Sequence, residues 1–204
     1  MSSDLSNIVA GMVVAGGRST RFGGEKAAAL LDGRPLLAWA VGRLQRSCRE
    51  VAVNARPWTE TEDLARAEGL PVLHDAPGDA DGPLAGVKAG LVWAASRGAA
   101  SLAVSPCDAP LLPDDLFARL IEAAGAGAAM AVTSEGRQPL CAVWPISALD
   151  DLTEALKDGA HPPTWRMLEN LGAAQVRFDP PEAFANINTR EDLDLAARRF
   201  AGGG

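Results

Sequence analysis

An uncharged apolar run near the N-terminus, residues 8–15, breaks into a glycine-rich loop. The run is rich in β-branched and small apolar residues, which is typical of a strand buried on both faces of a parallel sheet. Gly16 and Gly17 follow it, and without Cβ atoms they let the backbone turn sharply and approach a ligand with its N–H groups. Three basic residues come next in the same loop: Arg18, Arg21 and Lys26. The loop therefore favours an anionic ligand.

The loop does not match three well-known ligand-binding patterns. It is not a Walker A loop, because Lys26 follows Glu25 instead of glycine and no Ser or Thr comes after it. It lacks the GxGxxG dinucleotide fingerprint. It is not the GxSxG elbow of serine hydrolases, because Arg21 occupies the place of the second glycine. A basic surface turn that caps a strand is the alternative, but glycine pairs around several cations at a strand's end favour ligand binding.

Length, composition and charge suit one α/β domain. A chain of 204 residues can form a single domain with a full core, spanning residues 1–204. Its 48% apolar and 5% aromatic content suits helices packed on a central sheet. The formal net charge of −7 disfavours a nucleic-acid surface, so we expect no nucleic-acid partner. Against this acidic background the basic loop is more informative.

The cysteines and the N-terminal residues predict a cytoplasmic protein. Cys48, Cys107 and Cys141 are odd in number and show no CxxC spacing, which argues against a zinc site or a disulfide framework. The N-terminus lacks the charged and apolar regions of a signal peptide. No apolar run approaches the roughly 20 residues needed to span a bilayer, so we expect no membrane association. With only two histidines, a histidine-rich metal site is also disfavoured.

Beyond the loop, short apolar strands alternate with helical patterns. Residues 36–46 carry apolar side chains at helical spacing, and Thr59 with Glu62 forms a capping pattern for the next helix. This alternation predicts an α/β fold, a Rossmann-like, doubly wound and mostly parallel sheet flanked by helices. The expected strands are 8–15, 51–54, 71–74, 101–105, 128–133, 141–144 (preceded by the segment 136–140) and 175–178; the expected helices are 36–46, 59–68, 83–97, 113–124, 148–157, 164–171 and 189–200.

Asp108 follows the expected strand 101–105 and stands between Pro106 and Pro110. This position places it at a carboxyl end of the sheet, where open α/β sheets bind ligands. Mg²⁺ takes one or two carboxylates and completes its octahedron with water and phosphate oxygens. Asp108 is therefore a candidate ligand for a Mg²⁺ ion that bridges nucleotide phosphates. The alternative is that Asp108 caps the helix beginning near Pro113.

Two further segments carry both structural and ligand-binding signals. Gly82 and Pro83 precede an Ala-rich helix, where they can serve as a hinge and a good first helical residue. In an extended segment, Asn186 and Asn188 point the same way because they are two residues apart. The two amides can support a turn before the last helix, or they can bind a ligand. Thr189 with Asp192 can cap that helix.

These elements together resemble the nucleotidyltransferases, and within them the molybdenum cofactor guanylyltransferases of the MobA type. The resemblance rests on AGGRSTRFGGEK at 15–26 with GRPLL at 33–37, on GPLAG at 82–86, on Asp108 in a CDxP setting, and on FANINT at 184–189. The four elements occur in the right order and nearly end to end. The Ala-Gly-Gly loop and the GPLAG element both favour a guanine nucleotide.

The resemblance implies transfer of a guanylyl group from GTP to the terminal phosphate of Mo-molybdopterin, with Mg²⁺ as cofactor and release of pyrophosphate. Residues 1–125 would mainly bind the nucleotide and residues 126–200 mainly the acceptor. The resemblance implies catalytic roles for Lys26, Arg21 and Asp108, with Asp108 as the metal ligand. Acceptor contacts are implied for Asn186 and Asn188. Nucleotide contacts are implied for Ala15, Gly16, Gly17, Lys26, Asn54, Asp75, Gly82 and Asp108. Molybdenum-insertion proteins and molybdoenzyme chaperones would be protein partners.

Three positions depart from the family pattern. Glu25 stands where aspartate is usual, Gln138 where histidine is common, and Arg190 where proline is usual. Glu25 leaves the geometry around Lys26 open, and no role is assigned to Gln138. The alternative enzyme is a nucleotidyltransferase that uses CTP or a sugar- or alcohol-phosphate acceptor. A nucleotide-binding regulator without turnover is a second alternative, against which the presence of Lys26 and Asp108 argues.

Overall fold

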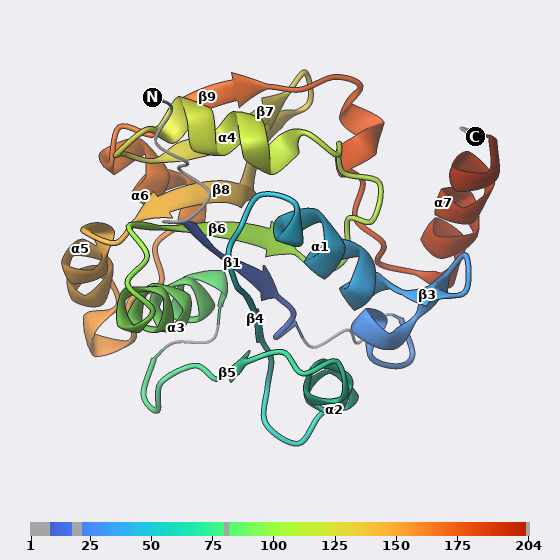
Figure 1. Cartoon of the computed structure of the whole chain (residues 1–204), viewed down its shortest axis with the longest axis horizontal. Helices are drawn as coiled ribbons and strands as arrows, with labels where there is room; N and C mark the ends of the chain where they lie inside the picture. Colours follow the sequence, from blue (N-terminus) through green and yellow to red (C-terminus); the bar gives the residue numbers. More distant parts are fainter. Residues whose placement is uncertain (1–8, 18–21, 80–81, 203–204) are drawn as a thin grey trace.

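The computed structural model describes residues 9–17, 22–79 and 82–202. Its central element is a seven-stranded sheet with the order β5-β4-β1-β6-β8-β7-β9 (Figure 1). The strands are β1 (Val9–Val14), β4 (Val51–Asn54), β5 (Val72–Leu73), β6 (Ser101–Pro106), β7 (Ala129–Thr133), β8 (Gly136–Pro145) and β9 (Ala174–Arg177). The α-helices are α1 (Leu36–Gln45), α2 (Glu60–Ala67), α3 (Pro83–Ser96), α4 (Leu116–Ala124), α5 (Ala148–Ala155), α6 (Thr164–Asn170) and α7 (Arg190–Gly202).

Strand β8 alone runs against the other strands of this sheet. The pairs β5–β4, β4–β1, β1–β6 and β7–β9 are parallel, whereas β8 is antiparallel to both β6 and β7. The prediction of a mostly parallel, doubly wound α/β sheet is thus confirmed. The expected strand at 141–144 and the segment 136–140 before it form one long strand, β8. The register of β7 against β8 shifts between Met130 and Ala131.

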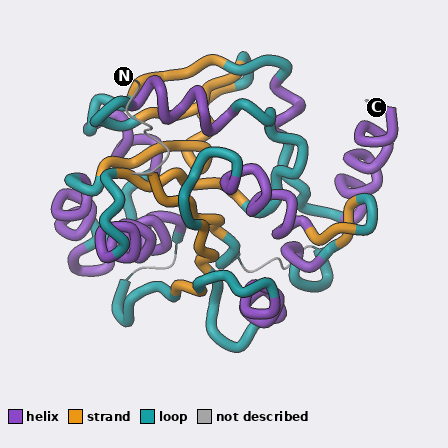
Figure 2. Tube along the Cα trace, in the orientation of Figure 1, coloured by secondary structure: helices purple, strands orange, loops and turns teal. Residues whose placement is uncertain are grey.

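Helices cover both faces of the sheet (Figure 2). Val9 and Val13 of β1 point to the face covered by α1 and α4, whereas Ala10 and Met12 point to the face covered by α3, α5 and α6. This alternation follows from the two-residue period of a strand. Because both faces are buried, the β1 sequence is apolar throughout, which is the pattern that predicted a central parallel strand.

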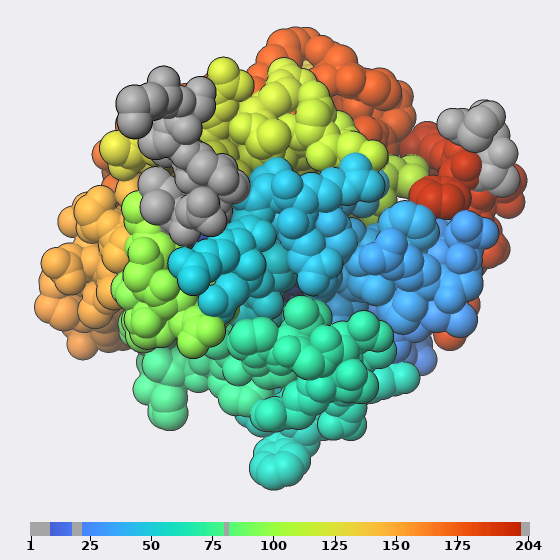
Figure 3. All heavy atoms as spheres, viewed as in Figure 1, coloured from blue at the N-terminus to red at the C-terminus, as the bar shows by residue number. Residues whose placement is uncertain are grey.

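A small hairpin, not predicted from the sequence, extends the fold beside α7. Strands β2 (Leu30–Leu31) and β3 (Arg34–Pro35) are joined by Asp32 and Gly33, whose φ angles of 52° and 71° suit a tight two-residue turn. Side chains of the hairpin and α7 share a third apolar cluster, and Figure 3 shows the two segments next to each other. The Asp-Gly pair was the available signal for this hairpin.

The order of the strands fixes where a ligand can bind. The chain leaves β1 through α1 to β4 on one side, whereas β6 pairs with the other side of β1. The connections therefore diverge at the carboxyl ends of β1 and β6, where open α/β sheets have their crevice. Within the described residues, no helix has the length and apolar character to cross a membrane.

Candidate active site

A pocket of about 410 Å³ lies at the carboxyl ends of β1, β4, β5 and β6. This volume lies in the range of small-molecule sites. All eight residues expected to contact a nucleotide line it: Ala15, Gly16, Gly17, Lys26, Asn54, Asp75, Gly82 and Asp108. The parallel strands bring these residues together although they are spread over much of the chain. Their individual roles remain predictions.

A short ion pair forms the polar centre of the pocket. Lys26 Nζ lies 2.6 Å from Asp108 Oδ2 and donates a second hydrogen bond, of 3.1 Å, to Asn188 Oδ1. The side chains of Lys26 and Asp108 are 17% and 23% exposed, so both are partly withdrawn from water yet reachable from the pocket. The ammonium group therefore connects the loop after β1, the loop after β6 and the segment before α7.

The segment before α7 is fixed by its backbone and by a helix cap. Ile187 N–H donates to the Asp108 carbonyl oxygen at 2.7 Å. The Asp192 carboxylate accepts from the N–H groups of Asn188 and Thr189 at 2.9 and 2.8 Å, and these bonds lower its pKa. Thr189 Oγ1 accepts from Asp192 N–H in return, as the predicted cap requires. These contacts hold Asn188 next to Lys26. Asn186 and Asn188 are both exposed and neither lines the pocket, so Asn188 reaches the site only through its bond to Lys26.

Asn54 and Asp75 form a second polar contact on the α3 side. Asn54 Nδ2 donates to Asp75 Oδ1 at 2.9 Å, although Asn54 is only 3% exposed. Gly86 makes this position possible, because a Cβ atom there would lie 2.4 Å from Asn54 Oδ1. Gly82 has φ of 154°, and a Cβ there would lie 1.9 Å from His161 Cε1. The glycines of the GPLAG element thus allow side chains to pack against the start of α3.

Glu25 links the turn that carries Lys26 to helix α2. Its carboxylate Oε2 accepts hydrogen bonds from Thr61 N–H and from Thr61 Oγ1 in the first turn of α2. Thr61 is 3% exposed, so these donors have little access to water. A carboxylate at a helix N-terminus also interacts favourably with the helix dipole. Glu25 thus connects the turn that carries Lys26 to α2, where sequence reasoning had left the geometry around Lys26 open.

Cys107 is on the wall of the pocket but is not a nucleophile. Burial raises the pKa of its thiol far above the usual range, and the neighbouring Asp108 carboxylate raises it further. The thiol is therefore neutral near pH 7, and neutral thiols are poor nucleophiles.

Asp108 is the pocket residue best suited to a divalent metal. A carboxylate is a hard oxygen donor, and Mg²⁺ needs only one or two of them when phosphates and water complete its shell. The described residues contain no group of three or more His, Cys, Asp or Glu that could hold a metal without a substrate. The donor set thus fits Mg²⁺ held jointly by Asp108 and nucleotide phosphates. Arg21, the other expected catalytic cation, lies outside the described residues.

Sequence reasoning assigned no binding role to several other residues of the pocket wall. These are Glu25, Arg56, Thr59, Thr61 and Leu140. Four of them lie in loops or first turns that follow β1 or β4, and Leu140 lies on β8. The rule that ligands gather at the carboxyl ends of parallel strands could have found Arg56, which comes two residues after β4.

The sheet order and the lysine–aspartate pair in this crevice define an open α/β protein with a polar ligand pocket at its strand ends. The MobA-like NTP transferase domain model matches residues 11–176, so the chain belongs to the MobA-like NTP transferase family. This confirms the resemblance seen in the sequence. A molybdenum cofactor guanylyltransferase of Cereibacter sphaeroides is 41% identical over 190 residues, which cover 91% of this chain and 94% of that protein. One of Cupriavidus taiwanensis is 41% identical over 197 residues, with the same coverage.

Solved structures agree in fold. A molybdopterin-guanine dinucleotide biosynthesis protein A from Archaeoglobus fulgidus has a TM-score of 0.75 and 25% identity, and covers 95% of this chain and 99% of its own. A 4-diphosphocytidyl-2C-methyl-D-erythritol synthase from Anaerococcus prevotii also has a TM-score of 0.75, with 12% identity and coverage of 98% and 100%. The second similarity concerns the fold alone.

We predict that Glu25→Ala lowers the free energy of unfolding by about 1–3 kcal/mol, because the Thr61 donors lose their acceptor in a buried place. Nucleotide affinity should fall as well, since the Lys26 turn loses its link to α2. Glu25→Asp, shorter by one methylene, should give an intermediate loss. Urea unfolding and nucleotide titration measure the two effects. The control is Glu60→Ala, because Glu60 lies in the same turn of α2 as Thr61 but has an exposed side chain. Equal losses in both variants would contradict the proposed link between Glu25 and α2.

Proposed function

We propose that this protein transfers GMP from GTP to the terminal phosphate of Mo-molybdopterin, forming molybdopterin guanine dinucleotide and pyrophosphate. The observation that most directly supports this proposal is the 2.6 Å contact between Lys26 Nζ and Asp108 Oδ2. It lies in a pocket lined by every residue for which a nucleotide contact was expected. Relatives about 40% identical over nine tenths of the chain are molybdenum cofactor guanylyltransferases, which supports the choice of substrates. The protein is accordingly a nucleotidyltransferase enzyme.

The reaction requires that the protein align the two phosphates and screen their charges, and it does not require a strong base. An oxygen of the acceptor phosphate attacks the α-phosphorus of GTP, and the bond from that phosphorus to the β-phosphate oxygen breaks. A phosphate monoester is largely dianionic at neutral pH, because its second pKa is about 6, so no residue must remove a proton first. Lys26 would interact with the charge at the α-phosphate, and the Gly16–Gly17 backbone would direct its N–H dipoles at the phosphates.

We propose that Asp108 holds Mg²⁺ when the nucleotide is bound. The metal would neutralise phosphate charge and polarise the phosphorus–oxygen bonds. Asp108 fits this task because its carboxylate is held by Lys26 on one oxygen and faces a pocket large enough for phosphates. Lys26 would at the same time keep the carboxylate in one orientation.

The two halves of the chain would divide the substrates between them. Residues 1–125 supply most of the pocket wall and would bind GTP, and residues 126–200 would bind the acceptor. Leu140 and Asn188 bring the second half to the pocket centre, Leu140 from the wall and Asn188 through its bond to Lys26. Asn186 and Asn188 would contact the pterin side. Such a role would place the protein in the cytoplasm, between molybdenum-insertion proteins and molybdoenzyme chaperones.

The direct test is pyrophosphate release with Mo-molybdopterin, Mg²⁺ and each of the four nucleoside triphosphates. We expect turnover with GTP, and a loss of ~10²-fold or more in Lys26→Ala, because one preorganised cation at the reacting phosphate is removed. Lys157→Ala, on a surface lysine paired with Glu154, is the control. A preference for CTP would show that the protein transfers a cytidylyl group and not a guanylyl group. Nucleotide binding without turnover would instead indicate a regulator.

Asp108→Asn should raise the Mg²⁺ concentration needed for half-maximal activity and lower the maximal rate. The amide keeps the shape of the side chain but lacks the charge that a hard cation needs. A Mg²⁺ titration of activity measures both values, and Asp114→Asn is the control because Asp114 pairs with Arg46 outside the pocket. An unchanged half-saturating concentration would place the metal elsewhere.

Substitutions of Asn186 and Asn188 should have different effects on GTP binding. Asn186 is exposed and lies off the pocket wall, so Asn186→Ala should weaken acceptor binding and leave GTP affinity unchanged. Asn188→Ala should affect both steps, because Lys26 loses an acceptor. Each lost hydrogen bond is worth ~1–3 kcal/mol, or about fivefold to 150-fold. Calorimetry with GTP and with the pterin measures this. Normal pterin affinity in both variants would direct the search for the acceptor site to Arg137 and Trp165, which lie in cation–π contact.

A further inference from the structure

The charged side chains that the described residues bring to the pocket wall are, on balance, acidic. Among the described residues, the wall carries three carboxylates and two cations: Glu25, Asp75, Asp108, Lys26 and Arg56. The balance of these groups is one negative charge. Besides the Mg²⁺ that would accompany the nucleotide, a cation whose charge the protein does not already compensate would attract a triphosphate most strongly.

Arg56 is such a cation, and Lys26 is not. The Lys26 ammonium group is compensated by Asp108 at 2.6 Å and also bonded to Asn188. Arg56, within the described parts of the chain, makes no ion pair, and its one hydrogen bond is a long contact of 3.5 Å from Nη2 to the Gly17 carbonyl oxygen. Its guanidinium group is therefore the uncompensated cation of the described pocket wall.

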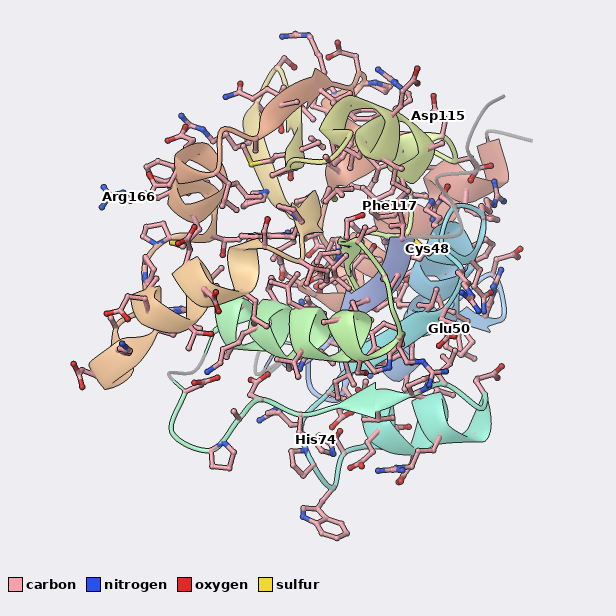
Figure 4. The ribbon with its side chains drawn as sticks, turned by 60° about the vertical axis from the view of Figure 1, so that its left-hand side comes forward. Cys48, Glu50, His74, Asp115, Phe117 and Arg166 are labelled. Atoms are coloured by element: carbon pink, nitrogen blue, oxygen red, sulfur yellow. The ribbon has the colours of Figure 1, made fainter. Side chains whose placement is uncertain are left out.

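The backbone around Arg56 is held in place although the side chain is exposed. His74 Nδ1 donates to the carbonyl oxygen of Ala55 at 2.9 Å, and Thr59 Oγ1 donates to that of Arg56 at 2.8 Å. Trp58 N–H donates to Glu62 Oε2 at 2.7 Å, with Trp58 at the unusual φ of 61°. Figure 4 shows His74 in the segment directly after β5. The guanidinium group thus projects from a fixed base.

The sheet order places Arg56 opposite the acceptor side. Arg56 follows β4, Asp108 follows β6, and β1 with its Gly16–Gly17 turn lies between these two strands. Leu140 and Asn188, which come from the acceptor half of the chain, reach the pocket on the β6 side. Arg56 and these residues therefore flank the glycine turn from opposite directions.

In phosphoryl and nucleotidyl transfer, the attacking and leaving oxygens lie roughly in line across the reacting phosphorus. An acceptor phosphate that approaches from the β6 side expels pyrophosphate toward the β4 side. We propose that Arg56 is a catalytic residue that binds the β- and γ-phosphates of the nucleotide and stabilises the departing pyrophosphate. This assignment rests on the proposed function. A planar guanidinium suits the task, because it can donate two parallel hydrogen bonds to phosphate oxygens.

The proposal predicts that Arg56 distinguishes a triphosphate from a monophosphate. In Arg56→Gln, affinity for GTP and for inorganic pyrophosphate should fall by about 10-fold to 150-fold, the equivalent of ~1.5–3 kcal/mol for hydrogen bonds to a charged group. Affinity for GMP should stay within about twofold, because GMP lacks the phosphates that Arg56 would bind. Arg56→Lys should recover part of the loss, since it restores the charge without the paired donors.

Calorimetry with GTP, GMP and pyrophosphate, without the acceptor, measures these affinities. Arg49→Gln is the matched control, because Arg49 is exposed and lies outside the pocket. Circular dichroism shows whether each variant is folded. If Arg56→Gln is not folded, the same affinities are measured with Arg56→Lys. Equal losses for GTP and GMP, or none for either, would overturn the assignment. A wild-type protein that binds no nucleoside triphosphate would instead contradict the proposed function, so the two failures are distinguishable.

Discussion

The ion pair between Lys26 and Asp108 is the contact on which the organisation of this pocket depends. It exists because β1 and β6 are parallel neighbours, so the loops that follow them end at the same edge of the sheet. The same ammonium group binds Asn188, whose segment also donates a backbone hydrogen bond to Asp108. Three distant parts of the chain therefore meet at one charge, and losing that charge would leave Asp108 partly buried without its cation.

Most of the supporting structure serves to keep these groups in a single arrangement. Glu25 binds the turn of Lys26 to α2, and Asp192 with Thr189 fixes the entry to α7. Gly86 leaves room for the Asn54 side chain that binds Asp75. Such preorganisation matters for a reaction between two anionic phosphates, because the protein must supply oriented dipoles and charges before the reactants meet.

Local patterns predicted much of the fold. The apolar run of β1, the capping pattern at Thr59 and the Pro83 start of α3 each depend on neighbours within a few residues, and the structure has all three elements there. The hairpin of β2 and β3 was missed although Asp32 and Gly33 carry a turn signal. The antiparallel direction of β8 follows from its two-residue connection to β7, which makes the pair a hairpin. The pairing of β8 with β6, a strand more than thirty residues away, could not be predicted from local sequence.

The sequence by itself determined which residue types are available for the chemistry: a glycine turn, a lysine, an aspartate after a strand and two amides near the C-terminus. It also determined the family, since four motifs in order indicate it and the family model matches. Only the tertiary structure decided how they meet. It placed Asn188 on Lys26, linked Glu25 to Thr61 and, among the described residues, left Arg56 without a carboxylate partner. The physical reason is that charge compensation depends on distance in space, which a local sequence pattern does not contain.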